Sequence, residues 1–350
     1  MSEASIGPNP FEAAMERAIE VYLRAPLGGR ATEETTSVYP QDNVVGLGIG
    51  NKVVGQRLTS TRCLRFYVMH KLALTGPFGR YCLPRQFAGV PTDVLDVGGP
   101  ILALAGSPVC QKRLRPARPG CSVGFKLPGA PPGVGSAGTI GAFVRLVDGQ
   151  YGILSNNHVL ANVDQLPLGT PILQPGIADN GKIHRDRIGE LRYVTEIKEG
   201  VNLDCAVAVV DSNDDVDPTF IGNEKLSSGI PIDAFEGMKV WKYGRTSQYT
   251  SGIVDSTNFA FRMNYDIVSV LRGQLISTVR SVIFRNQMTI LGPGQHGSNG
   301  PFAMEGDSGA VIIDLESNRP TGLLLGGTEK IAVANHLPSV LSHLNVEVVT

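Results

Sequence analysis

The sequence predicts a mainly β protein in which a small α/β domain precedes a larger β domain, and three observations support this fold class. Glycine supplies 42 of the 350 residues, well above its usual share of about 7%. From about residue 121 onward, short aliphatic runs alternate with Gly, Pro, Asn and Asp turns, and few windows have helical periodicity. Before residue 105, one amphipathic helical pattern precedes three strand-like runs. Short strands at regular spacing favour a sandwich or a barrel over a βαβ fold.

The first 105 residues contain the clearest helical signal. Pro10 follows Asn9, and FEAAMERAIEVYLR then has apolar residues at helical spacing with i,i+4 charge pairs, which predicts a helix that ends before Pro26. Three strands are expected after it, in NVVGLGIGNKVVG, RCLRFYVMHKL and VPTDVLDVG. We interpret residues 1–105 as a small N-terminal α/β domain.

Residues 106–120 separate the two predicted domains. This segment is rich in basic residues and proline and lacks hydrophobic periodicity, so we interpret it as a linker. Residues 121–350 then form the second domain. Its expected strands are GTIGAFVRLV, QYGILS, DRIGELRYV, LDCAVAVV, KVWKYG, SGIVDS, SVIFRNQMTI, AVIIDL and PTGLLLGG, with a short helix and a terminal strand in LPSVLSHLNVEVV.

The composition excludes several classes of function. A formal net charge of -1, from 31 basic and 32 acidic residues, gives no reason to expect nucleic acid or an anionic membrane surface as a partner. The N-terminus lacks the pattern of a signal peptide, and no apolar run approaches the roughly 18 residues that span a bilayer, so we expect a soluble cytoplasmic protein. The five cysteines share no CxxC spacing, which indicates reduced thiols. We expect no metal and no other cofactor.

A candidate nucleophile lies in MEGDSGAVIID, where Asp307 and Ser308 stand between Gly306 and Gly309. Glycines on both sides, just before a run of aliphatic residues, predict a tight bend that leads into a buried strand. Such a bend would leave Ser308 exposed and the neighbouring backbone N–H groups free, which suits a nucleophile beside an oxyanion site. The motif by itself also fits an ordinary turn.

A serine hydroxyl needs a base beside it and a third group that orients the base. His158 follows the strand-like run YGILS at the start of a short helical segment, so it should lie at a strand's edge and face a cleft. Asp204 begins the run LDCAVAVV, where a poorly solvated carboxylate would be held by a histidine Nδ1–H. Asp211 and Asp179 are poorer alternatives for the acid.

Taken in order, the blocks SNNHVLA, LDCAVAVV and GDSGAVII resemble the three signature blocks of the chymotrypsin-like serine peptidases. They are more similar to bacterial, HtrA-like enzymes than to animal digestive ones, and VWKYGRTSQYTSGIVDS is similar to a hairpin of the same relatives. The resemblance covers roughly residues 118–350, and we expect no PDZ domain. It implies a trypsin-like double β-barrel with the catalytic groups in the cleft between the barrels.

The resemblance also implies a role for each residue of the three blocks. His158 would be the general base and then the acid for the leaving amine, Asp204 would fix its tautomer, and Ser308 would attack the scissile carbonyl. The backbone N–H groups of Gly306 and Ser308 would receive the oxyanion.

Substrate preference and activation are also implied by the resemblance. Phe302 would lie at the base of the substrate pocket, with Gly326 and Gly327 in its wall, which predicts an apolar or small P1 residue. Ala310 replaces the glycine that usually closes the serine motif, and no Ile-Val-Gly-Gly-like stretch is present. Zymogen activation of the animal type is therefore not expected.

We therefore expect a bacterial, cytoplasmic serine endopeptidase whose substrate is a polypeptide. The N-terminal domain would recruit substrate or a regulatory partner, mediate self-association, or gate the cleft. A binding or scaffold protein on the same fold, with its triad present but not aligned, is the alternative from a different class. Limited self-processing in the exposed linker KRLRPARPG is a third hypothesis, although an apolar Phe302 argues against cleavage after a basic residue.

Overall fold

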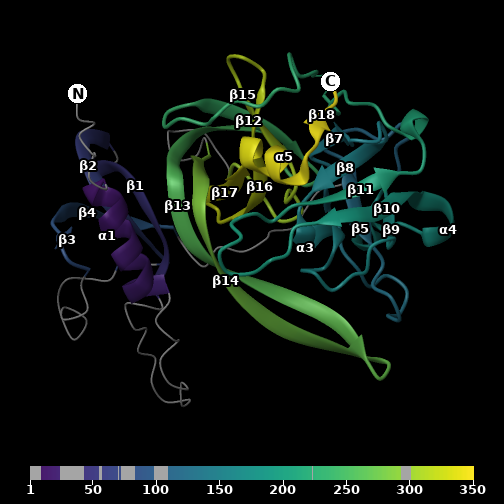
Figure 1. The fold of residues 1–350 in the computed structure, drawn as a ribbon, viewed down its shortest axis with the longest axis horizontal. Helices are drawn as coiled ribbons and strands as arrows, with labels where there is room; N and C mark the ends of the chain where they lie inside the picture. The colour runs from purple at the N-terminus through teal and green to yellow at the C-terminus, as the bar shows by residue number, and fades with distance from the viewer. Residues whose placement is uncertain are drawn as a thin grey trace, which may run out of the picture. The chain divides into compact units, whose positions relative to one another are not determined.

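The structure is a computed structural model of the chain, and it describes residues 9–23, 43–54, 57–69, 71, 83–97, 109–222, 224–292 and 301–350. The chain divides into two compact units: residues 1–100 with 258–262, and residues 101–257 with 263–350. Strands predominate (Figure 1), so the predicted mainly β class is confirmed. Within the described ranges, no helix is long and apolar enough to cross a membrane.

The first unit contains the predicted helix and the three predicted strands. Its elements are α1 (Pro10–Ala18), η1 (Ile19–Leu23), β1 (Val44–Val54), β2 (Arg57–Val68), β3 (Gln86–Phe87) and β4 (Val90–Asp96). The Asn9 side chain accepts a hydrogen bond from the N–H of Phe11 at 3.0 Å, and Pro10 occupies the first turn, where no intrahelical bond needs its missing N–H. β1 runs antiparallel to β2, and β2 runs parallel to β4. The predicted residues 24–42 and 98–105 of this domain lie outside the described ranges.

One feature of the first unit was not expected from the sequence. Residues 258–262, from the middle of the long strand β13 (Gln248–Leu271), belong to this unit and pair antiparallel with β1, with Phe261 opposite Gly46. Gly46 is suited to this position because a Cβ there would lie 2.3 Å from the ring of Phe259. The sheet of the first unit therefore includes a segment from far along the chain.

In the second unit, one sheet has eight strands in the order β18-β7-β8-β11-β10-β9-β5-β6. These strands are β5 (Ser122–Phe125), β6 (Gly138–Thr139), β7 (Ala142–Arg145), β8 (Tyr151–Ser155), β9 (Pro171–Leu173), β10 (Arg187–Val194), β11 (Ala206–Val210) and β18 (Glu347–Val348). Short helical segments precede, connect or follow these strands: η3 (Val109–Gln111), α3 (Asn157–Leu160), η4 (Ile177–Asp179), α4 (Ile183–Asp186) and η5 (Asn213–Asp215).

The second sheet of this unit closes on itself. Its strands follow the order β12-β15-β16-β17-β14-β13, and β12 also pairs with β13, which joins the two ends of that order. They are β12 (Lys239–Gly244), β13, β14 (Gln274–Leu291), β15 (Val311–Asp314), β16 (Pro320–Gly327) and β17 (Ile331–His336), followed by helix α5 (Leu337–Leu344). A closed ring of six strands leaves no unpaired edge within it.

Strand periodicity explains why some of the predicted runs, such as those of β7 and β15, have several consecutive apolar residues. Along β7, Ala142 and Val144 face one apolar core while Phe143 faces another. Along β15, Val311 and Ile313 join that first core, and Ile312 joins a third. Successive side chains of a strand point to opposite faces. β7 and β15 therefore bury both faces, one inside their own sheet and one in a core to which both sheets contribute.

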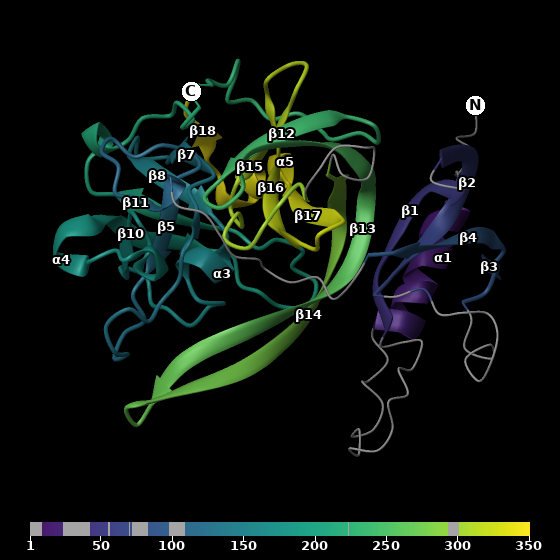
Figure 2. The same cartoon turned by 180° about the vertical axis from the view of Figure 1, so that it is seen from behind.

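β13 and β14 form a hairpin far longer than the sequence suggested. The sequence predicted only SGIVDS and SVIFRNQMTI as strands here, whereas β13 runs for 24 residues and β14 for 18. Arg272 and Gly273 connect them with φ values of +51° and +79°, as a two-residue turn of type I′ requires. Arginine is an unusual residue in such a turn, so the sequence gives little sign of it. Figures 1 and 2 show the end of the hairpin extending well beyond the two sheets of its own unit.

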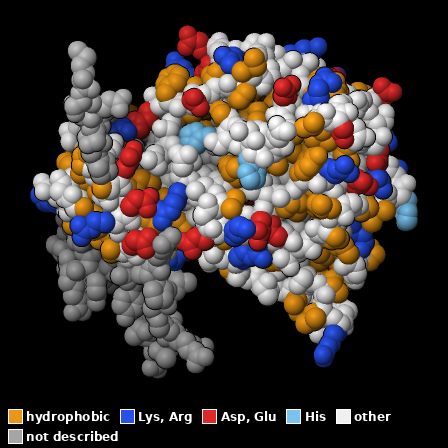
Figure 3. Space-filling view, viewed as in Figure 1, with side chains coloured by type: hydrophobic (Ala, Val, Ile, Leu, Met, Phe, Trp, Pro, Cys, Tyr) orange, Lys and Arg blue, Asp and Glu red, His pale blue; other side chains and the backbone are white. Residues whose placement is uncertain are grey.

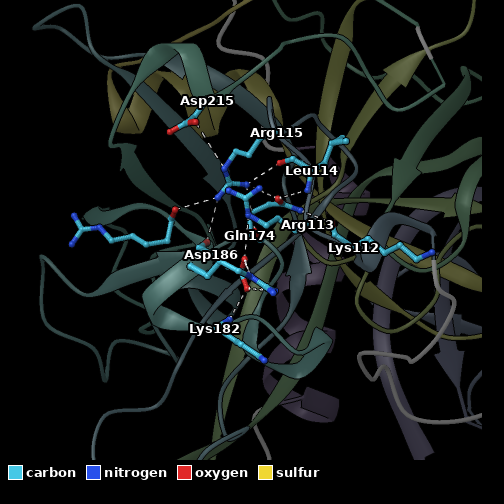
Figure 4. A network of polar contacts seen from close by, with 10 residues as sticks. Lys112, Arg113, Leu114, Arg115, Gln174, Lys182, Asp186 and Asp215 are labelled. Carbon is cyan, nitrogen blue, oxygen red and sulfur yellow. Dashed lines mark hydrogen bonds and ion pairs between the residues drawn. The ribbon is translucent and has the colours of Figure 1, made fainter.

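The segment interpreted as a linker is instead bound to the second unit wherever it is described, from residue 109 onward. Arg113 pairs with the buried carboxylate of Asp186 at 3.2 Å, and Arg115 donates to Oε1 of Gln174 at 2.6 Å (Figure 4). The division between the units falls at residues 100 and 101. Residues 112–114 and 116 of this segment are exposed all the same, so limited self-processing there stays a prediction.

Candidate active site

His158 lies in the short helix α3, directly after β8, as the sequence predicted. Its neighbour Asn157 fixes this turn through its side chain. The Asn157 amide Nδ2 donates to the carbonyl of Thr195 at 2.7 Å, and its Oδ1 accepts the N–H of Asp164 at 3.0 Å. The helix that carries the imidazole is thus tied to two loops of the first sheet.

Asp204 lies just before β11, and its carboxylate is fully buried against His158. Its Oδ2 is 2.5 Å from Nδ1 of His158, and its Oδ1 accepts the backbone N–H of the same residue at 3.2 Å. The hydroxyl of Tyr265 donates to Oδ2 at 2.7 Å. Burial raises the pKa of Asp204, but attraction to His158 and these hydrogen bonds outweigh burial and hold that pKa below its ordinary value. The carboxylate is therefore ionised at neutral pH.

The two alternative acids lie in other ion pairs. Asp211 accepts two hydrogen bonds from the exposed guanidinium of Arg187, each at 2.9 Å. Asp179 pairs with Arg245, whose Nε is 2.6 Å from Asp179 Oδ2. Of the three candidate acids, the structure brings Asp204 to His158.

Ser308 lies in a tight bend before β15, as predicted. Gly306 and Gly309 have φ values of +89° and +93°, and a Cβ at Gly309 would lie 2.1 Å from the hydroxyl oxygen of Ser155. Both glycines are therefore required by the backbone. The serine itself is 5% exposed, less than the sequence suggested, because its hydroxyl turns toward β16 and donates to the carbonyl of Leu325 at 3.0 Å.

The bend and helix α3 meet at β6. The carbonyl of Ser308 accepts the N–H of Thr139 at 2.9 Å. A Cβ at Gly138 would lie 2.5 Å from Val159, the residue after His158, and 3.0 Å from that same carbonyl oxygen. Nε2 of His158 is buried and has no hydrogen-bond partner among the residues that the structure describes. The histidine and serine segments are thus packed together, although no hydrogen bond joins the imidazole to the hydroxyl.

The bend that carries Ser308 has two backbone N–H groups that make no hydrogen bond within the described residues. Within the described chain, the N–H groups of Gly306 and Ser308 donate to no acceptor. The Thr246 hydroxyl donates to the carbonyl of Glu305. Carbonyl and N–H of one trans peptide point in opposite directions, so this bond keeps the N–H of Gly306 turned away from Thr246. The Gly306 carbonyl is held in turn by the hydroxyl of Thr139, at 2.8 Å.

A buried ion pair beneath the bend was missed in the sequence. Nζ of Lys242 is 3.0 Å from Oδ2 of Asp307, and neither side chain is exposed. Asp307 also accepts the N–H groups of Thr246, Ser247 and Met304 at 2.9–3.0 Å. Burial lowers the pKa of Lys242, and the negative charge of Asp307 opposes that effect. Lys242 comes two residues after Val240 and therefore lies on the same, inward face of the strand KVWKYG. A lysine at such a position is the signal that could have revealed this pair.

The residues predicted for the substrate pocket lie in the second sheet or in the segment between β14 and β15. Phe302 is 2% exposed and packs in the core inside that sheet, and its carbonyl accepts the hydroxyl of Thr250 at 2.6 Å. Gly326 and Gly327 lie on β16, opposite Val333 and Ala332 of β17. A P1 preference for apolar or small residues stays a prediction.

Comparison with known proteins gives a limited sequence match. No family model matches the chain. The protein NARROW LEAF 1 of Oryza sativa subsp. japonica is 28% identical over 225 residues, which cover 55% of this chain and 34% of the rice protein. This chain therefore spans about a third of the length of that relative.

Among solved structures, the chains similar to this one include three proteases. Protease A of Thermobifida fusca is 16% identical with a TM-score of 0.42, and the Nocardiopsis protease NAPase is 15% identical with a TM-score of 0.43. A glutamic acid-specific serine protease is 14% identical, also with a TM-score of 0.43. Each match covers 67% of this chain and the whole of the other one.

Proposed function

We propose that the second unit is a chymotrypsin-like serine endopeptidase that hydrolyses peptide bonds of a polypeptide substrate. The observation that carries this proposal is the buried pair of His158 and Asp204, whose 2.5 Å contact occupies Nδ1 and leaves Nε2 without a partner. A base oriented in this way, packed beside a serine with two free N–H groups, has the parts that acyl transfer needs.

The proposed reaction uses side chains and backbone of this chain alone. The reaction requires the Ser308 hydroxyl to leave the carbonyl of Leu325 and to donate to Nε2 of His158 instead. The imidazole takes the proton as the serine oxygen attacks the scissile carbonyl, and Asp204 stabilises the imidazolium that forms. The imidazolium then gives that proton to the leaving amine. Water, activated by the same base, releases the acyl group from the serine.

The negative oxygen of the tetrahedral intermediate would be received by the N–H groups of Gly306 and Ser308. Their lack of any acceptor within the described chain supports this role. The positive φ of Gly306 has a further consequence. A residue with a side chain is strained at this φ of +89°, and its Cβ would also lie 2.0 Å from Nη1 of Arg245. Substitution of Gly306 should therefore disturb the peptide that supplies one donor.

Labelling with a fluorophosphonate tests the proposal. The wild-type chain should be labelled on Ser308, and Ser308→Ala should abolish the label while Ser317→Ala, at an exposed surface turn, should keep it. Absence of label on folded wild-type protein, or label that persists in Ser308→Ala, would contradict the proposal. Cleavage of a diverse peptide mixture by the wild type, compared with Ser308→Ala, would then show whether P1 is apolar or small.

A binding or scaffold protein on the same fold is the second candidate. One observation favours it: the hydroxyl of Ser308 is engaged by the carbonyl of Leu325 and makes no bond to His158. This candidate predicts that the folded chain is not labelled, whereas the endopeptidase predicts that it is.

For both candidate functions, we propose that the first unit recruits the polypeptide or a regulatory partner. Binding of a substrate peptide by the chain without residues 1–100 would argue against recruitment by that unit.

Thr246→Val is expected to lower kcat about 10- to 100-fold, because the carbonyl of Glu305 loses its donor and the N–H of Gly306 is no longer held in place. Steady-state kinetics on a peptide substrate would measure this. Thr321→Val is the matched control, since Thr321 is also buried and donates to the carbonyl of Ile232. Equal kcat for Thr246→Val and the wild type would contradict this role of Thr246.

A further inference from the structure

We propose that Tyr265, carried by the long hairpin of β13 and β14, is a positioning residue that holds the carboxylate of Asp204 in register with the imidazole of His158. This inference rests on the proposed function and deepens it. It assigns to the hairpin, which the sequence analysis did not foresee at this length, a structural part in the catalytic centre.

The contact geometry supports this role. The Tyr265 hydroxyl lies 2.7 Å from Oδ2 of Asp204, the same oxygen that is 2.5 Å from Nδ1 of His158. The tyrosine is 4% exposed, and its ring centroid lies 5.8 Å from that of His158. On its other side it packs edge to face against Phe284 of β14, at 6.4 Å. Oδ2 of Asp204 thus contacts two donors, one from helix α3 and one from the hairpin.

The hydroxyl can serve as a donor throughout the working pH range. Burial raises the pKa of Tyr265 well above its ordinary value, and the negative charges of Asp204 and Asp164 raise it further. The hydroxyl therefore keeps its proton. Because a carboxylate accepts and cannot donate, the direction of the bond is settled: Tyr265 donates to Asp204.

Both strands of the hairpin are anchored on the loop that follows His158. From β13, the carbonyl of Val268 accepts a hydrogen bond from Nδ2 of Asn162 at 2.8 Å. From β14, Arg280 pairs with Asp164 at 2.7 Å. Asp164 in turn accepts a hydrogen bond from Nδ2 of Asn157, the residue before His158. In Figure 1 the hairpin passes beside α3 before it extends away.

These anchors explain why the hydroxyl arrives at the carboxylate in a defined position. A single rotation about the Cβ–Cγ bond of Asp204 would take Oδ2 away from Nδ1 of His158. The hydroxyl of Tyr265 opposes that rotation, because the ring that carries it is packed and its strand is bonded to the same loop as the imidazole. Farther along the hairpin, Leu271, Leu275 and Val279 are exposed, and Figure 3 shows hydrophobic side chains gathered near its end, away from Asp204.

Tyr265→Phe in the full chain tests the inference. We expect kcat to fall about tenfold with KM unchanged, because the tyrosine is buried and a hydrogen bond to a charged group is lost. With one donor fewer, the carboxylate of Asp204 keeps more of its charge for the imidazolium of His158 and stabilises it more strongly, so the acid limb of the rate profile should move to higher pH. Tyr151→Phe, at a tyrosine whose hydroxyl contacts Arg145, is the control and should leave the profile in place. A fall in kcat without movement of the acid limb would contradict a positioning role.

A second measurement does not need activity. In the Ser308→Ala background, the proton on Nδ1 of His158 should give a downfield NMR resonance through its bond to Asp204, and Tyr265→Phe should shift or broaden it. An unchanged resonance in a folded variant would overturn the inference about Tyr265. If that resonance responds while the wild type is never labelled by a fluorophosphonate, the positioning role stands and the proposed peptidase function fails.

Discussion

Replacement of Asp204 by asparagine should lower kcat about 10⁴-fold while the chain stays folded. An asparagine amide of nearly the same shape can donate to Nδ1 of His158, and the imidazole proton then moves to Nε2. In that tautomer Nε2 cannot accept the proton of Ser308, so the base is lost although the groups remain in place. Peptide hydrolysis at neutral pH, with protein folding followed by circular dichroism, would measure the effect.

Asp211→Asn is the matched control for this prediction, since Asp211 is an exposed acid that pairs with Arg187. Its kcat should stay within about twofold of the wild type, as is usual for a surface substitution. A loss of comparable size in both variants, or full activity of Asp204→Asn, would contradict the assignment of the acid.

Because the pKa of Asp204 is lowered in the folded state, its contribution to stability is present at neutral pH and is lost as the pH falls. Asp204→Asn should therefore weaken the dependence of stability on pH at the acidic side.

Lys242→Met is expected to destabilise the protein by about 3–5 kcal/mol, because it leaves the buried charge of Asp307 without its partner. Asp307 also holds the N–H groups of three residues around the bend of Ser308. Loss of the ion pair should therefore disturb the free N–H groups, and activity should fall along with stability. Chemical denaturation of the wild type and the variant would give the difference in the free energy of unfolding.

The double variant Lys242→Met with Asp307→Asn separates the two effects. Asparagine removes the unpaired charge and keeps an acceptor for some of the N–H groups, so part of the lost stability should return. Activity should not return, because the bend would still lack its full set of hydrogen bonds. Equal stability of Lys242→Met and the double variant would show that the charge of Asp307 is not what makes the single substitution costly.

Local patterns in the sequence predicted most of the elements that carry the site. β8, which precedes His158, and β11, which follows Asp204, fall in the predicted runs QYGILS and LDCAVAVV, and α3 begins directly after β8. These segments could be predicted because their signals are local: apolar alternation, a capped helix start, and glycines that permit positive φ. The order of the three blocks likewise pointed to His158, Asp204 and Ser308, and the contact between the first two is present in the structure.

Contacts between residues far apart in the chain were beyond those patterns. The hydroxyl of Tyr265 reaches Asp204 across 61 residues of sequence, and its strand gives no sign of where it ends because an arginine occupies the turn. Arg113, in a segment interpreted as a linker, pairs with a buried carboxylate in the distant helix α4. Neither segment has a periodic apolar pattern from which its partner could be predicted.

The sequence by itself determined that this chain is mainly β and that a histidine, an aspartate and a serine stand in a meaningful order. The tertiary structure alone decided which buried charges are paired, which hydroxyl supports the acid, and where the hydroxyl of Ser308 points. The physical reason is that strand periodicity acts over a few residues. The partner of a buried polar group, in contrast, is selected by packing and desolvation after the sheets have closed around it.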